Sequence, residues 1–450
     1  MNSKAAARST LPPSAKPDWI GGHFRSFRKD PTQFLTNLSR LGDVTYFRMG
    51  PQPGFFVNHP DLIRDVLVVN HHKFTKGRAL QRAKALLGEG LLTSEDEFHL
   101  RQRRMIQPAF HRQRIADYAR SMVEYGERMS WMDGDVRNID TEMMQLTLQV
   151  VGKTLFGVEI GSEADEVGQA MTELVSMFDF LLVPFSEVLE KLPLPQTKRL
   201  QRAKESLNSI IYSIINERRR TGEDRGDLLS MLLLAQDEDN GETMTDGQVR
   251  DEALTLFLAG HETTAVALTW TWYLLSQNPT AEAKLHEELD TVLRGRLPSF
   301  DDLAELRYTE AVIAESMRLL PPAWGIGRLA RQEHEFNGYK RSPKALVLIS
   351  PYVTQRDARF WNEPESFKPE RWLSQTVKEA NQRYIYFPFG GGIRRCVGES
   401  FAWTEAVLLL ATIARKWKLS LDPGQKIGLK PVITLRTKYG MKMHVQRRSS

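Results

Sequence analysis

Residues 389–398 read Phe-Gly-Gly-Gly-Ile-Arg-Arg-Cys-Val-Gly, and this stretch says more about the fold than any other in the chain. Three consecutive glycines allow positive φ angles and a close approach of the backbone to another group. The residues that follow, 397–416, are apolar on most faces and predict a buried helix. Cys396 therefore stands where a glycine loop turns into a helix N-terminus, a place that favours a thiolate.

Cys396 is the only cysteine among 450 residues. The chain can form no internal disulfide and no zinc site built on several thiolates, which argues against a disulfide-stabilised secreted protein. A lone cysteine is most often a small buried hydrophobe, so its neighbours must decide its role. Arg394 and Arg395 add positive charge, and a thiolate held by N–H donors beside the bulky Phe389 suits the axial ligand of a haem iron.

Five positions of the stretch follow the spacing Phe-x-x-Gly-x-Arg-x-Cys-x-Gly: Phe389, Gly392, Arg394, Cys396 and Gly398. The stretch resembles, with no departure, the haem-binding signature of the cytochrome P-450 superfamily. The resemblance implies a soluble bacterial-type haem-thiolate monooxygenase with haem b (iron protoporphyrin IX) as cofactor and Cys396 as metal ligand. It also implies a mainly α fold with small β-sheets, the haem lying between a long central helix and the cysteine-loop helix.

The long central helix is expected from about Asp246 to Gln277. Thr245 is a good N-cap, Gln248 completes a capping box, and Asn278-Pro279 ends the helix. About 30 helical residues span roughly 45–50 Å, enough to cross a whole domain.

The apolar middle of this helix is interrupted at 259–264 by Ala-Gly-His-Glu-Thr-Thr. Polar groups in a buried helix must be satisfied or functional, and Thr263 can bond the carbonyl of Ala259. A polar stripe with a glycine kink explains the segment equally well when it is taken alone. A zinc-protease motif does not fit, because position 265 is alanine instead of a second histidine. The segment resembles the family's acid–alcohol pair, which implies that Glu262 and Thr263 deliver protons to dioxygen, with Ala259 among the cofactor-binding residues.

Other residues acquire a role only through the resemblance. Glu315 and Arg318, three positions apart, would alone predict a surface ion pair of little value, but with Arg371 they resemble the family's buried structural triad. His99 and Arg103 resemble a His-x-x-x-Arg form of the family's Trp-x-x-x-Arg. The resemblance makes haem propionate ligands of His99, Arg103, Arg328 and Arg394, while solvent-facing arginines remain the alternative for most of the basic run that includes Arg103.

Apolar spacing predicts the remaining elements. Alternation from Gly42 to Val57 predicts a β-hairpin, and Ala345–Ser350 is strand-like. Helices are expected at 60–70, 98–128, 140–157, 165–183, 197–220, 280–294 and 302–319. Helix-rich elements follow one another without a βαβ rhythm and without a linker. We therefore expect a single domain over 21–450 after a flexible polar lead-in over 1–20.

Charge and hydropathy limit the partners. With 61 basic against 56 acidic residues, the net charge of +5 permits an acidic partner, while a dedicated nucleic-acid binder is the weaker interpretation. The N-terminus has neither a signal-peptide core nor about 20 consecutive apolar residues. We expect a soluble, cytoplasmic monomer with no transmembrane anchor.

No residues remain for a flavin or iron–sulfur module, so electrons are expected from a ferredoxin or flavodoxin-like donor with its reductase. This donor is expected to dock on the basic surface near Arg395 and the arginine-rich helix.

The sequence leaves the substrate and the reaction partly open. Apolar candidates for substrate contact are Leu86–Leu92, Met177–Phe185, Leu258–Ala259, Ala323–Ile326 and Thr434–Leu435, and they would suit a fatty acid, terpenoid, steroid or polyketide. Dioxygen-dependent hydroxylation or epoxidation is the first hypothesis. A haem-thiolate isomerase or peroxygenase needs no electron donor, and the Glu262-Thr263 pair speaks against it. A haem sensor or carrier would need no proton relay.

Overall fold

A computed structural model describes residues 11–19, 21–159, 195–237 and 241–448. The predicted helix over 165–183, the candidate substrate residues 177–185 and residues 1–10 of the lead-in lie outside the described residues. The chain divides into two compact units, each described by itself below. We call Met1–Arg78, Ala323–Glu365 and Val377–Arg395 the sheet unit, and Ala79–Pro322, Ser366–Thr376 and Cys396–Ser450 the helical unit. The single domain stays a prediction.

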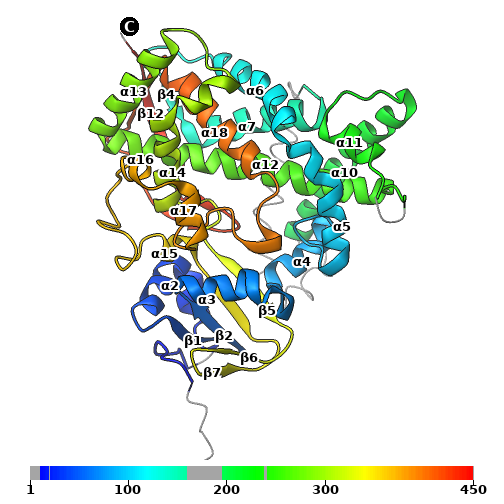
Figure 1. The fold of residues 1–450 in the computed structure, drawn as a ribbon, viewed down its shortest axis with the longest axis vertical. Helices are drawn as coiled ribbons and strands as arrows, with labels where there is room; N and C mark the ends of the chain where they lie inside the picture. The colour runs from blue at the N-terminus through cyan, green and yellow to red at the C-terminus, as the bar shows by residue number, and fades with distance from the viewer. Residues whose placement is uncertain (1–10, 20, 160–194, 238–240, 449–450) are drawn as a thin grey trace, which may run out of the picture. The chain divides into compact units, whose positions relative to one another are not determined.

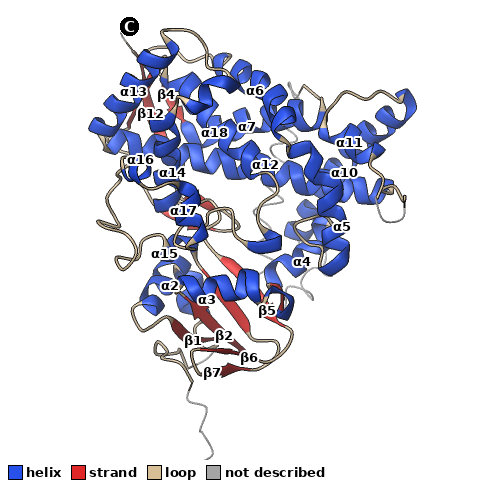
Figure 2. Cartoon of the chain, viewed as in Figure 1, coloured by secondary structure: helices blue, strands red, loops and turns tan. Residues whose placement is uncertain are grey.

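The sheet unit is built on a five-stranded sheet in the order β1-β2-β8-β5-β3 (Figure 2). Its strands are β1 (Val44–Met49), β2 (Gln52–Val57), β8 (Leu346–Ile349), β5 (Ile326–Ala330) and β3 (Phe74–Lys76). The predicted hairpin is confirmed: β1 and β2 pair antiparallel, with Val44 opposite Val57. β2 pairs parallel with β8, which confirms the strand expected near 345–350. Within the expected lead-in, the carbonyl of Pro13 accepts a hydrogen bond from the Tyr46 N–H.

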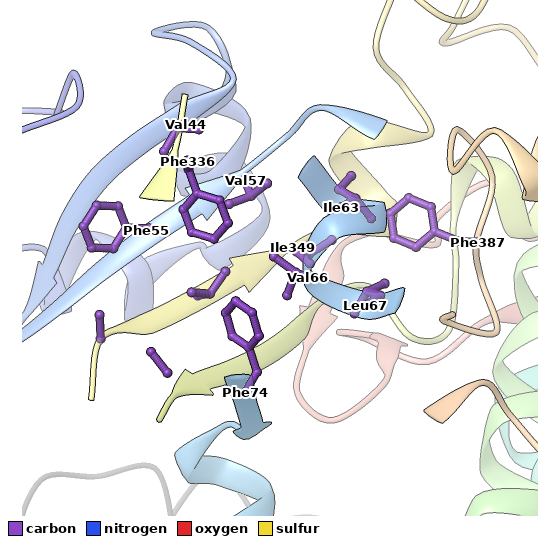
Figure 3. Packing of buried hydrophobic residues seen from close by; sticks show 13 residues of the cluster. Val44, Phe55, Val57, Ile63, Val66, Leu67, Phe74, Phe336, Ile349 and Phe387 are labelled. Atoms are coloured by element: carbon purple, nitrogen blue, oxygen red, sulfur yellow. The ribbon is translucent and has the colours of Figure 1, made fainter. Parts of the chain in front are cut away.

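Short helices and one further ribbon complete this unit. The helical segments are α1 (Phe24–Lys29), α2 (Pro31–Ser39), α3 (Pro60–Arg64), η1 (Asp65–Val69), η2 (His71–Lys73), α15 (Pro351–Thr354), α17 (Val377–Gln382) and η5 (Gly392–Arg394). The ribbon pairs β6 (His334–Phe336) with β7 (Tyr339–Arg341). Figure 3 shows the core, where Phe55, Val57 and Ile349 of the sheet pack with Ile63 of α3 and with Phe387.

The helical unit is organised around α12 (Asp246–Gln277), whose ends are those the sequence predicts. Thr245 and Gln248 form the expected capping box. Most of the helix is buried, because other helices pack along it (Figure 1). These neighbours are α7 (Ile139–Phe156), α10 (Pro195–Thr221), α11 (Leu228–Leu234), α13 (Pro279–Leu293), α14 (Arg307–Leu319) and α18 (Glu399–Ala414).

The rest of the unit comprises shorter helices and two small sheets. The helices are α4 (Arg78–Leu87), α5 (Asp96–Ile106), η3 (Gln107–Phe110), α6 (Arg112–Glu127), η4 (Phe300–Ala304) and α16 (Arg371–Ser374). One sheet has the order β4-β12-β9, and the other pairs β10 with β11. Their strands are β4 (Val136–Asn138), β12 (Lys442–Arg447), β9 (Trp417–Leu421), β10 (Leu429–Pro431) and β11 (Leu435–Thr437).

Three predicted helices have the wrong limits. The single helix over 98–128 is wrong: Pro108 has no N–H with which to continue the α-helical hydrogen bonds, and the chain passes through η3 and the extended His111 before α6 begins. The helix over 302–319 is two pieces, η4 and α14. The cysteine-loop helix begins at Glu399 instead of 397. Among the described residues, the helices are all too short or too polar to span a bilayer.

Candidate active site

In the sheet unit, the glycines before the cysteine allow the loop to run directly against its neighbours. Gly390 and Gly392 have φ angles of +73° and +65°, which L side chains rarely adopt. A Cβ on Gly392 would overlap the carbonyl oxygen of Leu67 in η1, and one on Gly391 would lie 2.6 Å from the Tyr384 ring. The predicted close approach of the glycine loop is therefore confirmed.

The base of this loop is fixed from two sides. The Phe387 ring lies in the sheet-unit core next to Ile63 and Leu67 (Figure 3). The Phe387 N–H donates to Oε1 of Gln355 at 2.9 Å, and Gln355 has no exposed surface. Sequence analysis assigns Gln355 no role, because nothing near position 355 points to a partner 32 residues further along the chain.

Three more predicted cofactor-binding residues belong to the sheet unit. Arg328 is on β5, paired with Val347 of β8 and with Lys76 of β3. Arg394 ends the short helix η5, and Phe389 lies in the turn before Gly390. Arg328, Arg394 and Phe389 are each half-buried, so each keeps surface with which to contact a ligand.

Cys396 is the first residue of its segment of the helical unit, and it is exposed. An exposed side chain differs from the inert, buried cysteine of the alternative interpretation. Burial lowers the pKa of the nearby Arg103, and the charge of Cys396 acts in the opposite direction and raises it. The two side chains are therefore close enough to interact as opposite charges. Gly398 is the N-cap residue of α18, and a Cβ there would lie 3.4 Å from the Phe110 ring.

His99 is a buried side chain of α5 with a defined partner. Its Nδ1 lies 3.1 Å from the carbonyl oxygen of Leu91, and only 3% of the residue is exposed. A carbonyl oxygen can only accept, so a hydrogen bond to Leu91 requires the hydrogen on Nδ1, where the Ser94 hydroxyl also lies 3.4 Å away. His99 can then donate to a carboxylate through Nε2 only as the imidazolium.

The middle of α12 contains an exposed small residue in an otherwise buried helix. Ala259 is exposed and Gly260 and Thr263 are partly exposed, while Leu258 and Glu262 are buried. The Thr263 hydroxyl donates to the Ala259 carbonyl at 2.8 Å, as the sequence predicts.

The Glu262 carboxylate and the Thr263 hydroxyl have different partners. Glu262 is 2% exposed, and its Oε1 accepts from the Thr434 hydroxyl at 2.6 Å and from Arg436 Nε at 2.9 Å. β11 is held in place because the Leu435 carbonyl accepts from the Trp270 indole at 2.6 Å. Sequence analysis missed Arg436. The acid of the predicted acid–alcohol pair, Glu262, forms an ion pair with this arginine.

The predicted Glu315 triad is confirmed and buried. Oε2 of Glu315 accepts from Arg318 Nε at 2.9 Å, and Oε1 accepts from Arg371 Nε at 2.9 Å. Glu315 and Arg318 have no exposed surface. Two further donors, the Lys368 N–H and the Trp372 indole, reach the same carboxylate.

The candidate substrate segments differ in exposure. Leu86, Leu87 and Leu258 belong to one buried cluster of the helical unit. Thr434 and Leu435 are buried as well, whereas Ala323–Ile326 of the sheet unit is half-buried or exposed. Ala259 is thus the exposed apolar residue among the helical-unit candidates that the structure describes.

These features suit a haem-thiolate site. The exposed Cys396, with Arg103 nearby as an opposite charge, is the type of residue that would ligate a haem iron, and the exposed Ala259 is a small residue of the long helix. Thr263, on the same helix, carries a hydroxyl that would serve as a proton donor. The donor set therefore fits the cofactor that the cysteine motif implies.

Comparison with known proteins gives the family. The cytochrome P-450 family model matches residues 12–442. Cyclooctatin synthase of Streptomyces melanosporofaciens is 41% identical over 432 residues, which cover 95% of this chain and 94% of that protein. Cyclooctat-9-en-7-ol 5-monooxygenase of the same organism is 38% identical over 90% of this chain and 88% of its own. Pentalenene oxygenase of Streptomyces avermitilis is 36% identical over 91% of each chain. The chain therefore belongs to the cytochrome P-450 family and is a haem-thiolate monooxygenase.

Proposed function

We propose that Cys396 is the iron ligand of this monooxygenase, and that Glu262 and Thr263 supply the protons that its reaction consumes. When bound, the haem provides the redox-active iron at which dioxygen is activated. The haem propionates would be held by His99, Arg103, Arg328 and Arg394. The observation that carries the proposal is the exposed Cys396, charged against Arg103 and placed just before α18.

The spectrum of the carbon monoxide complex tests the iron ligand. The reduced, carbon monoxide-treated protein should show the strongly red-shifted Soret band of thiolate ligation. Cys396→Ser should lose that band, since a hydroxyl is a far weaker ligand than a thiolate. A wild-type protein without the band, or a Cys396→Ser variant that keeps it, would overturn the assignment.

Replacing Thr263 with alanine tests the proton supply. Because general-acid groups contribute roughly 10²–10⁴-fold, Thr263→Ala should lower the product formed per electron consumed by at least about tenfold. Thr263→Ser keeps a hydroxyl and should restore most of the coupling. Thr264→Val removes the neighbouring hydroxyl and should leave coupling near the wild-type value. A fully coupled Thr263→Ala enzyme would contradict the role of the hydroxyl.

We propose a terpenoid, among the substrate classes that the sequence leaves open. Two of the relatives are named for an olefin, pentalenene, and for an unsaturated alcohol, cyclooctat-9-en-7-ol. The apolar Ala259 and the partly buried Phe257 and Leu92 suit such largely hydrocarbon molecules. Cyclic terpene alcohols should shift the Soret band at lower concentrations than fatty acids of equal carbon number. Tighter binding of the fatty acids would contradict the class.

We propose that the electron donor is a separate acidic protein that binds the arginine-rich α5–α6 region. Arg104, Arg112 and Arg120 are exposed there. Changing all three to glutamine should slow electron transfer from a ferredoxin and flatten its dependence on ionic strength. Unchanged kinetics would contradict this docking site.

We propose a cytoplasmic location as well. A chain with a single cysteine forms no internal disulfide and therefore requires no oxidising compartment.

A further inference from the structure

Two consecutive carboxylates of α12 bind the loop that joins α4 to α5. The Glu89 N–H donates to Oδ2 of Asp251 at 2.8 Å, and the Leu91 N–H donates to Oε2 of Glu252 at 2.9 Å. Two backbone N–H groups of this loop, which is built of turns, thus meet adjacent acids of the helix. Neither bond is needed to complete α12, so they serve to hold the loop.

Glycine at position 90 makes this approach possible. A Cβ on Gly90 would overlap the Thr255 hydroxyl, and it would lie 2.6 Å from the carbonyl oxygen of Asp251. The loop backbone therefore rests on the surface of α12, with no side chain between them. Any displacement of the loop from α12 would stretch the bond from Leu91 to Glu252.

Glu252 and Asp251 lie in different surroundings. Asp251 lines an open hollow at the surface together with Glu89 and Arg250. Glu252 has no exposed surface, and its second oxygen accepts from Gln102 Nε2 at 3.0 Å. A buried carboxylate is costly unless it is hydrogen-bonded, and Glu252 has hydrogen bonds from the Leu91 N–H and from Gln102.

The Leu91 backbone connects Glu252 to His99. The N–H of Leu91 is held by Glu252, and its carbonyl oxygen accepts from Nδ1 of His99 at 3.1 Å. The carbonyl fixes the ring orientation and the protonated nitrogen of His99, and Glu252 fixes the carbonyl. Partners behind a ligand act in this way when they orient imidazoles around a metal.

We propose that Glu252 is a positioning residue for cofactor binding: it fixes Leu91, and Leu91 orients His99 so that Nε2 is presented to a haem propionate. The inference rests on the proposed role of His99.

A double-mutant cycle between Glu252 and His99 tests the inference. Haem is titrated into the apoproteins of wild type, Glu252→Ala, His99→Ala and the double variant. Outer partners of ligands typically contribute 10–100-fold, so Glu252→Ala should weaken haem binding by roughly tenfold. The same substitution should have almost no effect once His99 is alanine, because the contact through which it acts is gone. The haem reduction potential should show the same loss of additivity.

Two variants separate positioning from general damage. Glu252→Gln keeps an oxygen for the Leu91 N–H, and its new NH2 can face Gln102, whose Oε1 has no hydrogen bond among the described residues. It should restore most of the haem affinity. Asp251→Ala removes the neighbouring loop contact. Its effect on the free energy of haem binding should simply add to that of His99→Ala. If Glu252→Ala does not fold, Gly90→Ala, which pushes the loop away from Thr255, replaces it in the cycle.

Hydrogen exchange in the apoprotein provides a second readout. The Leu91 amide should exchange faster in Glu252→Ala and at the wild-type rate in Asp251→Ala. An unchanged Leu91 rate in Glu252→Ala, or an additive cycle with His99, overturns the role of Glu252 alone. If His99→Ala has no effect on haem affinity, the propionate assignment of His99 fails and this inference fails with it, while the Soret test of Cys396 still stands by itself.

Discussion

Glu315 of α14 and Glu405 of α18 lie in neighbouring helices of the same unit, and both side chains have no exposed surface. Their surroundings are opposite. Glu315 accepts hydrogen bonds from Arg318, Lys368, Arg371 and Trp372. Neither oxygen of Glu405 has a hydrogen bond of good geometry among the described residues. Burial raises the pKa of Glu405 to about 8, and the Thr264 hydroxyl offsets only part of that shift.

The comparison shows that partners, and not burial alone, set the charge of a buried carboxyl. The donors that converge on Glu315 replace the water that its carboxylate has lost on burial. Glu405, whose burial is opposed only in part by the Thr264 hydroxyl, remains a neutral acid at neutral pH. Glu262 is intermediate in its number of hydrogen-bond donors, because one hydroxyl and one guanidinium both donate to its Oε1. Three substitutions test this series.

Removing Glu315 should have the largest effect. Glu315→Ala leaves Arg318 and Arg371 without their anion in a buried site, which costs about 3–5 kcal/mol of unfolding free energy. Urea unfolding of the apoprotein measures the loss. Glu310→Ala, on the exposed side of the same helix, should change stability by less than about 0.5 kcal/mol. Equal effects of the two substitutions would contradict the structural role of the triad.

Glu405 should make stability depend on pH. Its pKa rises from 4.5 in the unfolded chain to about 8 in the fold. Between those values the folded state holds a proton that the unfolded chain has released, so stability is greatest below pH 4.5 and falls as pH rises toward 8. The loss by pH 7 is on the order of 3 kcal/mol. Glu405→Gln cannot ionise and should lack this component.

The measurement is the difference between wild type and Glu405→Gln in urea unfolding at several pH values from 5 to 8. The variant should gain relative stability steadily with pH. Parallel curves for the two proteins would show that Glu405 has a hydrogen-bonded anionic state, and would remove the contrast with Glu315.

The smallest effect is expected at Arg436. Arg436→Met leaves Glu262 with the Thr434 hydroxyl but without its cation, at a cost of about 1–3 kcal/mol. Because Arg436 is one of the two donors that hold the Glu262 carboxylate in place, Arg436→Met should also lower the product formed per electron consumed. Arg436→Lys keeps a cationic donor and should lower this ratio less. An unchanged ratio of product to electrons in Arg436→Met would show that Arg436 has no part in proton supply.

Sequence predicts well the features that are encoded locally. The ends of α12 follow from a capping box over the four residues Thr245–Gln248 and from Asn278-Pro279, and both ends are confirmed. The hairpin of β1 and β2 and the close approach at Gly392 follow from alternation and from glycine chemistry. These features need no information about which distant segment lies nearby.

The features that sequence missed depend on distant partners. Arg436 is 174 residues from Glu262, and the Glu252 bond to Leu91 spans 161 residues. An arginine in a terminal strand and a glutamate one turn into a helix look like ordinary surface residues when read along the chain. The break at Gln107–Phe110 was visible as Pro108, but apolar spacing continued across it and favoured one long helix.

The fit of Gly392 against Leu67 has a consequence for mutational tolerance. Every missense change of a single base in a glycine codon introduces at least a Cβ atom, and at this position that atom would meet the Leu67 carbonyl at a φ of +65°. No missense substitution of a single nucleotide at codon 392 should thus survive selection for a coloured, haem-loaded protein. Codon 134 is the natural comparison: Gly134 also has a positive φ, but no atom lies within 4 Å of its added Cβ, so the same selection should recover variants there.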